Sequence, residues 1–480
     1  MKFCYQQLEL IESAESFVLK GKDQDGEPVQ VQIDRSNNVL KKISSTEADA
    51  IKKTSSQRIS AVLGSIELLS GRYLIVVKES TPAAKIDTIH TIHSIVEAKI
   101  IPYYLKPVPT QHQSDESRYL ELLSTILHDG TFYFSYSYDA TITTQNWFKQ
   151  SKTLSYVGEN VSITRLCIIP TLAIGSILSE MINMRIIHHS LMNTFCGMVS
   201  WRRILLLKVM PVLAGLFQPL EDVSRSVIDI NLNIIVVETK EAKVDDITFN
   251  LTILSRMGCK RVGTRYNMRG ADPVGNVANF VETEQIVEYN NHFISFLQVR
   301  GSIPLSWSQK ANIQYKPPVT LRKEGKTFEK HFDNILDRYS KIVVVNLVNQ
   351  KGSEKRLADE YENQYKSYKE NHNIKYIAFD FHNKCKSMNY NAIAELTDQV
   401  EGPMREFGFF HMNATDGKIL SEQKGVIRSN CIDCLDRTNV CQSVFSKIML
   451  TNQLQLLNII PKTNKVADYK GLNYTYQNGM

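Results

Sequence analysis

The sequence lacks the features of secreted and membrane-spanning proteins. Its first residues hold no apolar run of the kind found in a secretory signal peptide. No stretch reaches the ~18 uninterrupted apolar residues that a transmembrane helix needs. The eight cysteines are scattered, with Cys431, Cys434 and Cys441 as the one cluster, and they form no disulfide framework. The sequence therefore predicts a protein of a reducing compartment.

A strong excess of one charge is also missing. The 480 residues include 56 basic and 50 acidic side chains, which gives a net charge of +6. This mild positive excess is compatible with binding to an anionic membrane surface, and it is equally compatible with an ordinary solvated surface. We expect no nucleic-acid partner. A hydrophobic content of 43% predicts a globular protein whose core forms without disulfides, and the length predicts two or three domains.

What the sequence does contain is a phosphate-binding pattern in residues 428–439, RSNCIDCLDRTN. Cys431 precedes Arg437 by six positions, and the hydroxyl residue Thr438 follows. A cysteine attacks only as its thiolate, and a nearby guanidinium and a helix N-terminus favour that form. The planar fork of an arginine binds two phosphate oxygens at once. The spacing therefore predicts a loop that wraps a phosphate group.

The flanks of this loop predict a strand before it and a helix after it. Residues 424–427 are short and rich in β-branched side chains. From Asn439 on, apolar residues recur at helical spacing. The first N–H groups of a helix have no partner within the helix, so they are free to point at a phosphate.

The twelve-residue string closely resembles the catalytic signature of the Sac-type phosphoinositide phosphatases. The resemblance spans about residues 55–140 and 250–455. It implies hydrolysis of phosphatidylinositol phosphates, chiefly the 4-phosphate, with the 3-phosphate and the 3,5-bisphosphate as further substrates. It also implies action at the cytosolic face of endoplasmic-reticulum or Golgi membranes. Segments that carry the resemblance include 61–69, 131–139, 253–256, 263–272, 279–285, 298–304 and Trp307.

Three regions follow from pattern and resemblance. Residues 1–140 contain short β-rich runs at 16–19, 29–33 and 73–77, which predict a β-rich domain that acts as a scaffold or docking surface. In residues 141–235 the family would place a Trp-Asn pair and a short entry to the catalytic domain, and this sequence does not align with either. The two apolar stretches of this segment, 166–178 and 204–217, each hold a proline. Three interpretations of this segment remain: buried helices, marginal membrane segments, or an inserted or aberrantly translated segment. We favour the last.

Residues 236–480 are predicted to form the catalytic domain. Residues 342–352 and 374–382 are each expected to form a buried strand that runs into a polar turn, with helices at 357–370 and 392–407. This alternation predicts a mixed α/β fold, so the whole chain is expected to be α+β with a mixed α/β catalytic domain. The resemblance ends near Pro461, where the family's catalytic domain normally continues and its endoplasmic-reticulum members add two membrane helices. We therefore expect this sequence to hold a C-terminally truncated catalytic domain. A membrane anchor, if the protein has one, is expected in a longer form of the chain.

The predicted reaction has two steps and needs no metal or cofactor. The Cys431 thiolate attacks phosphorus and forms a phosphocysteine, which water then hydrolyses. Arg437 and the N–H groups of the loop stabilise charge on the phosphate oxygens, and Thr438 is expected to donate a hydrogen bond to the sulfur. The remaining loop residues are expected to contact the substrate, namely Arg428, Asn430, Ile432, Cys434 and Leu435.

The leaving alkoxide needs a proton, and two loop carboxylates are the nearest donors in the sequence. We favour Asp433 as the acid and expect Asp436 to hold the loop through backbone N–H groups, although the reverse is almost as plausible. Asp380 and His382 are further candidates, each with an equally good structural explanation. Lys351 and Arg300 are basic residues for which simple solvation is the plainer interpretation.

Other interpretations of the motif lead to other classes of protein. Cys431-x2-Cys434 is also typical of redox sites, and with His382-x2-Cys385 it would make four zinc ligands. The aspartates and the arginine have no task in such a zinc knuckle, so we favour the phosphate loop. The spacing alone fits phosphotyrosine equally well. A protein tyrosine phosphatase and an inactive phosphoinositide-binding scaffold are therefore the alternatives.

Overall fold

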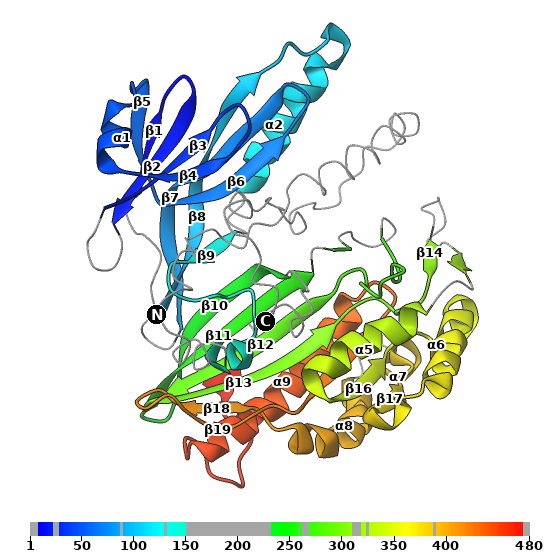
Figure 1. The fold of residues 1–480 in the computed structure, drawn as a ribbon. Helices are drawn as coiled ribbons and strands as arrows, with labels where there is room; N and C mark the ends of the chain where they lie inside the picture. The colour runs from blue at the N-terminus through cyan, green and yellow to red at the C-terminus, as the bar shows by residue number, and fades with distance from the viewer. Residues whose placement is uncertain are drawn as a thin grey trace. The chain divides into compact units, whose positions relative to one another are not determined.

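The computed structural model describes residues 8–22, 28–86, 90–128, 132–149, 232–258, 260–261, 268–309, 318–322, 326–386 and 390–473. Two compact units divide the chain (Figure 1). One comprises Met1–Ile142 and Asn146–Asp229, and the other comprises Thr143–Gln145 and Ile230–Met480. Most of the segment 141–235, including both of its apolar stretches, lies outside the described residues, so its interpretation stays a prediction. Among the described residues, no helix is long and apolar enough to span a membrane.

The N-terminal unit contains two antiparallel sheets. One has the strand order β4-β3-β2-β1-β5, and the other has the order β6-β7-β8-β9. Alternate residues of the two sheets share one hydrophobic core, in which Leu10 and Phe17 meet Leu74 and Ile101, so the sheets pack face to face. The elements are β1 (Leu8–Glu12), β2 (Ser16–Lys22), β3 (Pro28–Asp34), β4 (Leu40–Ile43), α1 (Ser45–Ala50), β5 (Ser55–Ile59), β6 (Ala61–Glu67), β7 (Gly71–Ile86), β8 (His90–Leu105), the 3-10 turn Thr110–His112, α2 (Gln113–Leu127) and β9 (Tyr133–Ser135).

Each sheet is covered by a helix on its outer face. Ala48 of α1 packs against Ile11 and Val18 of the first sheet. Leu123 of α2 packs against the second sheet, in the same cluster as Ile75. The unit is β-rich, as the sequence predicts, but the aromatic stretch 131–139 contributes only the three-residue strand β9.

The C-terminal unit is built on one nine-stranded mixed sheet. Its main path has the order β10-β11-β12-β13-β20-β16-β17, with β18 and β19 added beside β13. Strands β10 to β13 pair antiparallel, whereas β13, β20, β16 and β17 run parallel. The strands of this sheet are β10 (Leu232–Val244), β11 (Ile247–Gly258), β12 (Val281–Tyr289), β13 (His292–Arg300), β16 (Lys341–Asn346), β17 (Ile374–Ala378), β18 (Phe410–Asn413), β19 (Lys418–Ser421) and β20 (Gly425–Asn430). Two further strands, β14 (Trp307–Gln309) and β15 (Val319–Leu321), pair with each other in a separate sheet.

Helices cover both faces of the parallel half of this sheet. Ile342 and Val344 of β16 pack with α5 and α6, while the intervening Val343 and Val345 pack with α8 and α9. The sheet is therefore a middle layer between two helical layers, as expected for buried parallel strands. The helices are α5 (Thr327–Tyr339), α6 (Lys355–Ser367), α7 (Phe381–Lys384), α8 (Ile393–Phe407) and α9 (Asp436–Leu456), with 3-10 turns at Gly352–Glu354, Asn371–Asn373, Tyr390–Ala392 and Val466–Asp468.

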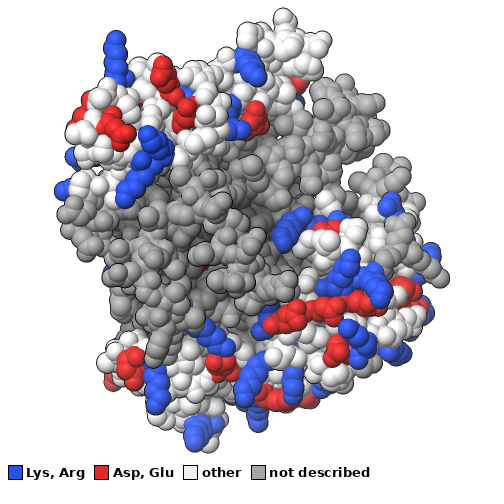
Figure 2. Space-filling view, viewed as in Figure 1, with Lys and Arg blue, Asp and Glu red and all other residues white. Residues whose placement is uncertain are grey.

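The mixed α/β architecture predicted for the C-terminal region is confirmed. The predicted helices at 357–370 and 392–407 appear as α6 and α8. Strand β17 ends at Ala378, earlier than expected, because Asp380 caps the short helix α7 by accepting the N–H of Asn383. On the described surface, basic and acidic side chains are interspersed, in line with the small net charge (Figure 2).

Candidate active site

The loop after β20 lies where four parallel strands end together. Because β13, β20, β16 and β17 run in one direction, their carboxyl ends share one edge of the sheet, and ligand sites in α/β sheets lie at such an edge. Arg300 ends β13, and Cys431 directly follows β20. The N–H of Leu347, just after β16, donates to the carbonyl of Asn430 over 2.8 Å. The predicted strand, loop and helix are thus present as β20, residues 431–435 and α9.

The sulfur of Cys431 accepts a hydrogen bond from the loop itself. The backbone N–H of Cys434 lies 3.1 Å from Cys431 Sγ. Cys434 adopts a left-handed backbone with φ of +53°, which folds the loop back over the sulfur. Helix α9 begins two residues later, at Asp436. An N–H directed at the sulfur and a helix N-terminus beside it are both arrangements that stabilise negative charge.

Cys434 has a different environment from Cys431. Its thiol is buried and donates to the carbonyl oxygen of Cys431 over 3.3 Å. Burial raises the pKa of the Cys434 thiol to about 12, and the nearby Cys431 adds to the shift. Cys434 is therefore protonated near neutral pH, when only a thiolate would attack phosphorus.

Arg437 lies in the first turn of α9, where the loop that follows β16 holds its guanidinium. Nη1 donates to Leu347 O over 3.1 Å, to Asn349 Oδ1 over 3.4 Å and to Glu354 Oε2 over 3.2 Å, and Nη2 donates to Glu354 Oε1 over 3.2 Å. Burial lowers the pKa of Arg437, but the Glu354 carboxylate outweighs it, so the net shift is upward; Cys431 contributes in the same direction. The guanidinium therefore lies within electrostatic range of the sulfur.

Two further arginines border the loop. Arg300 donates a hydrogen bond to Asn439 Oδ1. Burial lowers the pKa of Arg300, and the nearby Cys434 and Cys431 offset this lowering only in part. Arg269 donates to the carboxylate of Asp433 and, over 3.0 Å, to the carbonyl of Ile432. Sequence reasoning considered Arg300 only as a weak candidate and did not consider Arg269. The nearest signal for Arg269 is its place in the segment 267–272, which carries family resemblance.

The two loop aspartates lie in different environments. Asp433 holds the loop through Arg269, whereas Asp436 is exposed at the start of α9. Within the described residues, the carboxylate of Asp436 makes no hydrogen bond or ion pair. Thr438 is buried, and its hydroxyl donates to Leu435 O over 2.7 Å rather than to the sulfur. The catalytic roles of all three residues stay predictions.

The other predicted substrate contacts lie around the base of the loop. Arg428 is 0% exposed and donates to Asn430 Oδ1 over 3.0 Å and to Ser302 O. Asn430 is also buried and donates to Asn346 Oδ1 over 2.7 Å. Ile432 and Leu435 are half-buried. The contacts of Arg428 and Asn430 are internal to the core, so a direct contact of either with substrate stays a prediction that this geometry does not favour.

The remaining candidates surround the same edge of the sheet. Asp380 accepts the N–H groups of Asn383 and Gln350 over 3.1 Å each, which is a structural use of its carboxylate. Lys351 and His382 are exposed. In the part of the chain that the structure describes, no three His, Cys, Asp or Glu side chains gather closely enough to hold a metal ion. The zinc knuckle weighed from the sequence is not assembled there.

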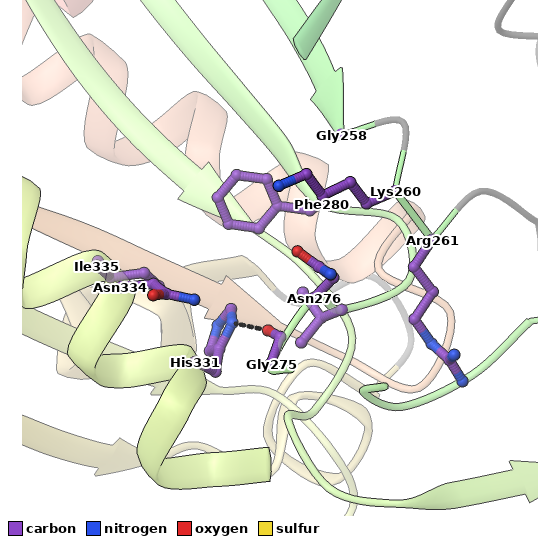
Figure 3. A pocket seen from close by; sticks show the side chains of 10 residues that line it. Gly258, Lys260, Arg261, Gly275, Asn276, Phe280, His331, Asn334 and Ile335 are labelled. Atoms are coloured by element: carbon purple, nitrogen blue, oxygen red, sulfur yellow. Dashed lines mark hydrogen bonds between the residues drawn. The ribbon is translucent and has the colours of Figure 1, made fainter. Parts of the chain in front are cut away.

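A separate pocket lies beside α5. Figure 3 shows that Lys260, Asn276 and Asn334 extend toward it and that the ring of His331 forms one wall. His331 is buried, and its Nδ1 lies 3.0 Å from the carbonyl of Gly275. No residue of the loop 428–439 belongs to its lining. This pocket is therefore not the phosphate site that the sequence predicts.

A family model and individual relatives all point to the same protein family. The family model of the SacI homology domain matches residues 60–386, a range that ends before Cys431. The chain is 33% identical over 488 residues to phosphatidylinositol-3-phosphatase SAC1-A of Danio rerio, an alignment that covers 100% of this chain and 74% of that protein. Phosphoinositide phosphatase SAC7 of Arabidopsis thaliana is 30% identical, over 98% of this chain and 72% of its own length. Phosphatidylinositide phosphatase SAC2 of Danio rerio is 39% identical over 224 residues, 45% of this chain and 20% of its own.

Proposed function

The chain belongs to the SacI homology domain family of phosphoinositide phosphatases, and we propose that it removes the phosphate of phosphatidylinositol 4-phosphate through a phosphocysteine. The 3-phosphate, which the name of the Danio rerio relative SAC1-A specifies, is proposed as a second substrate, and the 3,5-bisphosphate as a third. We place the reaction at a cytosolic membrane face, where the headgroups of these lipids are found.

The observation that carries this proposal is the N–H of Cys434 directed at Cys431 Sγ at the N-terminus of α9. The same N-terminus holds Arg437, so a phosphate above the sulfur would meet amide N–H groups and a guanidinium together. The raised pKa of the Cys434 thiol argues against Cys434 as the nucleophile. Cys431 is therefore the attacking residue that we propose.

The proposed chemistry balances in two displacements. In the first, the sulfur of Cys431 forms a bond to phosphorus, and the bond from phosphorus to the inositol oxygen breaks with its electron pair. The leaving oxygen takes a proton from an acid, for which we propose Asp436. In the second, water attacks phosphorus, the S–P bond breaks, and the thiolate and inorganic phosphate are released. The proton of the attacking water returns to the same carboxylate.

Release of inorganic phosphate from short-chain phosphatidylinositol phosphates of each isomer tests the proposal. Soluble short-chain lipids separate the chemical step from membrane binding. We expect the 4-phosphate to be hydrolysed fastest. Faster hydrolysis of a phosphotyrosine peptide would identify a tyrosine phosphatase instead, and binding without release would identify a scaffold.

The replacement Cys431→Ser should lower turnover at least ~10³-fold while substrate binding persists, because a hydroxyl is a far poorer nucleophile at neutral pH. Cys385→Ser is the matched control, since Cys385 is also a buried free thiol but lies outside the loop. Turnover that survives Cys431→Ser would show that another residue attacks.

A further inference from the structure

Glu354 and Arg437 form a two-point ion pair at the edge of the candidate site. Both carboxylate oxygens of Glu354 lie 3.2 Å from the guanidinium, one opposite Nη1 and the other opposite Nη2. The side chain of Glu354 is 7% exposed and that of Arg437 is 21% exposed. We propose that Glu354 is a positioning residue that orients Arg437 for phosphate, an inference that rests on the function proposed above.

The geometry of a guanidinium explains why this orientation matters. Its five N–H bonds form two edges that can each donate two hydrogen bonds to one partner, the Nη1/Nη2 edge and the Nε/Nη2 edge. Glu354 occupies the first edge. Within the described residues, Nε and the second hydrogen of Nη2 have no partner. The free edge matches two oxygens of a phosphate, so Glu354 and a substrate phosphate can bind neighbouring edges of the same group.

Glu354 is itself fixed to the parallel sheet. Its Oε2 accepts the N–H of Asn349 over 2.7 Å. Leu347, which accepts from Arg437 Nη1, is bonded through its own N–H to Asn430 at the end of β20. The carboxylate, the guanidinium and the residue before Cys431 thus belong to one hydrogen-bonded unit. A long side chain held in this way has lost most of its rotamer freedom before substrate arrives.

An alternative role for Glu354 is a latch that competes with phosphate for Arg437. The two roles predict opposite changes in phosphate affinity when Glu354 is removed. A latch would have to release the guanidinium, so its removal would raise phosphate affinity. A positioning residue keeps its contact in the transition state, so its removal would lower both turnover and the affinity for a transition-state analogue.

The test is Glu354→Gln, which keeps the size of the side chain but removes its charge and places an NH₂ group against a guanidinium donor. We measure kcat and KM with short-chain phosphatidylinositol 4-phosphate and inhibition by orthovanadate. We expect kcat to fall about 10²-fold with KM changed by less than about threefold, and vanadate inhibition to weaken by a similar factor to kcat. The matched control Glu406→Gln removes an exposed carboxylate that pairs with Lys341, and should leave all three values unchanged.

A double-mutant cycle separates positioning from a general structural effect. If Glu354 acts through Arg437, Glu354→Gln should have almost no further effect on vanadate inhibition once Arg437 is replaced by Ala. Glu354→Asp, which keeps the charge with a shorter reach, should recover part of the lost kcat and serves as the second variant if Glu354→Gln does not fold.

Each outcome decides one question. Wild-type kinetics or tighter vanadate inhibition in Glu354→Gln would overturn the positioning role, as would an equal loss in the Arg437→Ala background. A wild-type chain that releases no phosphate would instead overturn the proposed function, so the two failures are distinguishable.

Discussion

At the scale of single residues, like side chains within the loop 428–439 have different contacts. Cys431 and Cys434 are both buried, but only Cys431 Sγ accepts an N–H, while Cys434 keeps its proton. Asp433 is engaged by Arg269, whereas Asp436 is exposed at the N-terminus of α9. Identical residue types three positions apart therefore have different chemistry because the loop turns between them.

These contacts predict different consequences for the two aspartates. Asp436→Asn should lower kcat/KM on a phosphoinositide by about 10²–10⁴, the usual contribution of a general acid. The loss in kcat/KM should be much smaller on p-nitrophenyl phosphate, whose leaving group needs no proton, because kcat/KM does not include the later hydrolysis of the phosphocysteine. Asp433→Asn should lower both rates by a similar factor, because it releases Arg269 and loosens the loop.

Initial rates on a short-chain phosphatidylinositol 4-phosphate and on p-nitrophenyl phosphate, measured for both variants, check the prediction. If Asp433→Asn, rather than Asp436→Asn, slows the phosphoinositide reaction much more than the p-nitrophenyl phosphate reaction, then Asp433 donates the proton, as the sequence first indicated.

At the scale of elements, β20 sets the position of Cys431, the proposed nucleophile. All six residues from Gly425 to Asn430 are buried, and the strand pairs in parallel with β13 on one side and β16 on the other. Helix α8 packs across its start. A Cβ added at Gly425 would lie 2.4–2.6 Å from ring atoms of Phe407, closer than any real contact.

Gly425→Ala should therefore destabilise the C-terminal unit by about 1–3 kcal/mol, the usual effect of overpacking a core, and should lower kcat by shifting β20. Gly471→Ala is the matched control, because a Cβ there would meet nothing within 4 Å. Urea denaturation and phosphate release at saturating substrate give the two measurements. Equal stability of the two variants would show that Phe407 moves aside without cost.

At the scale of the whole molecule, the C-terminal unit includes a short piece of chain from far upstream. Thr143–Gln145 belongs with residues 230–480. The N–H of Thr144 donates to the buried carboxylate of Glu284, which Arg256 also contacts over 2.6 Å. Gln145 accepts the N–H of Gln423 over 2.8 Å and donates to its carbonyl over 3.3 Å.

Gln145→Ala should consequently destabilise the C-terminal unit by about 1–3 kcal/mol, because it leaves the N–H of Gln423 without its acceptor in a buried place. Gln399→Ala, on the exposed face of α8, should change stability by less than about 0.5 kcal/mol. Loss of phosphatase activity on heating the full chain reports the unfolding of this unit. A midpoint for Gln145→Ala equal to that of the control would contradict a stabilising role for this upstream segment.

Much of the local structure followed from the sequence because its determinants are local. The strand at β20, the tight loop and the helix α9 were all predictable from side-chain periodicity within about 25 residues, although α9 begins at Asp436 rather than Asn439. The helices α6 and α8 and the strand β16 were predictable for the same reason. The family itself followed from the twelve residues of the loop.

Only the tertiary structure decided which side chains surround that loop. Glu354 lies 83 positions from Arg437, and Arg269 lies 164 positions from Asp433. No periodicity connects such pairs, because the tertiary fold brings them together: Glu354 follows β16, the parallel neighbour of β20, and Arg269 lies between β11 and β12. The sequence by itself predicted the nucleophile and its phosphate loop. Only the fold decided that Asp433 pairs with Arg269 while Asp436 is exposed, and that Glu354 contacts the guanidinium of Arg437.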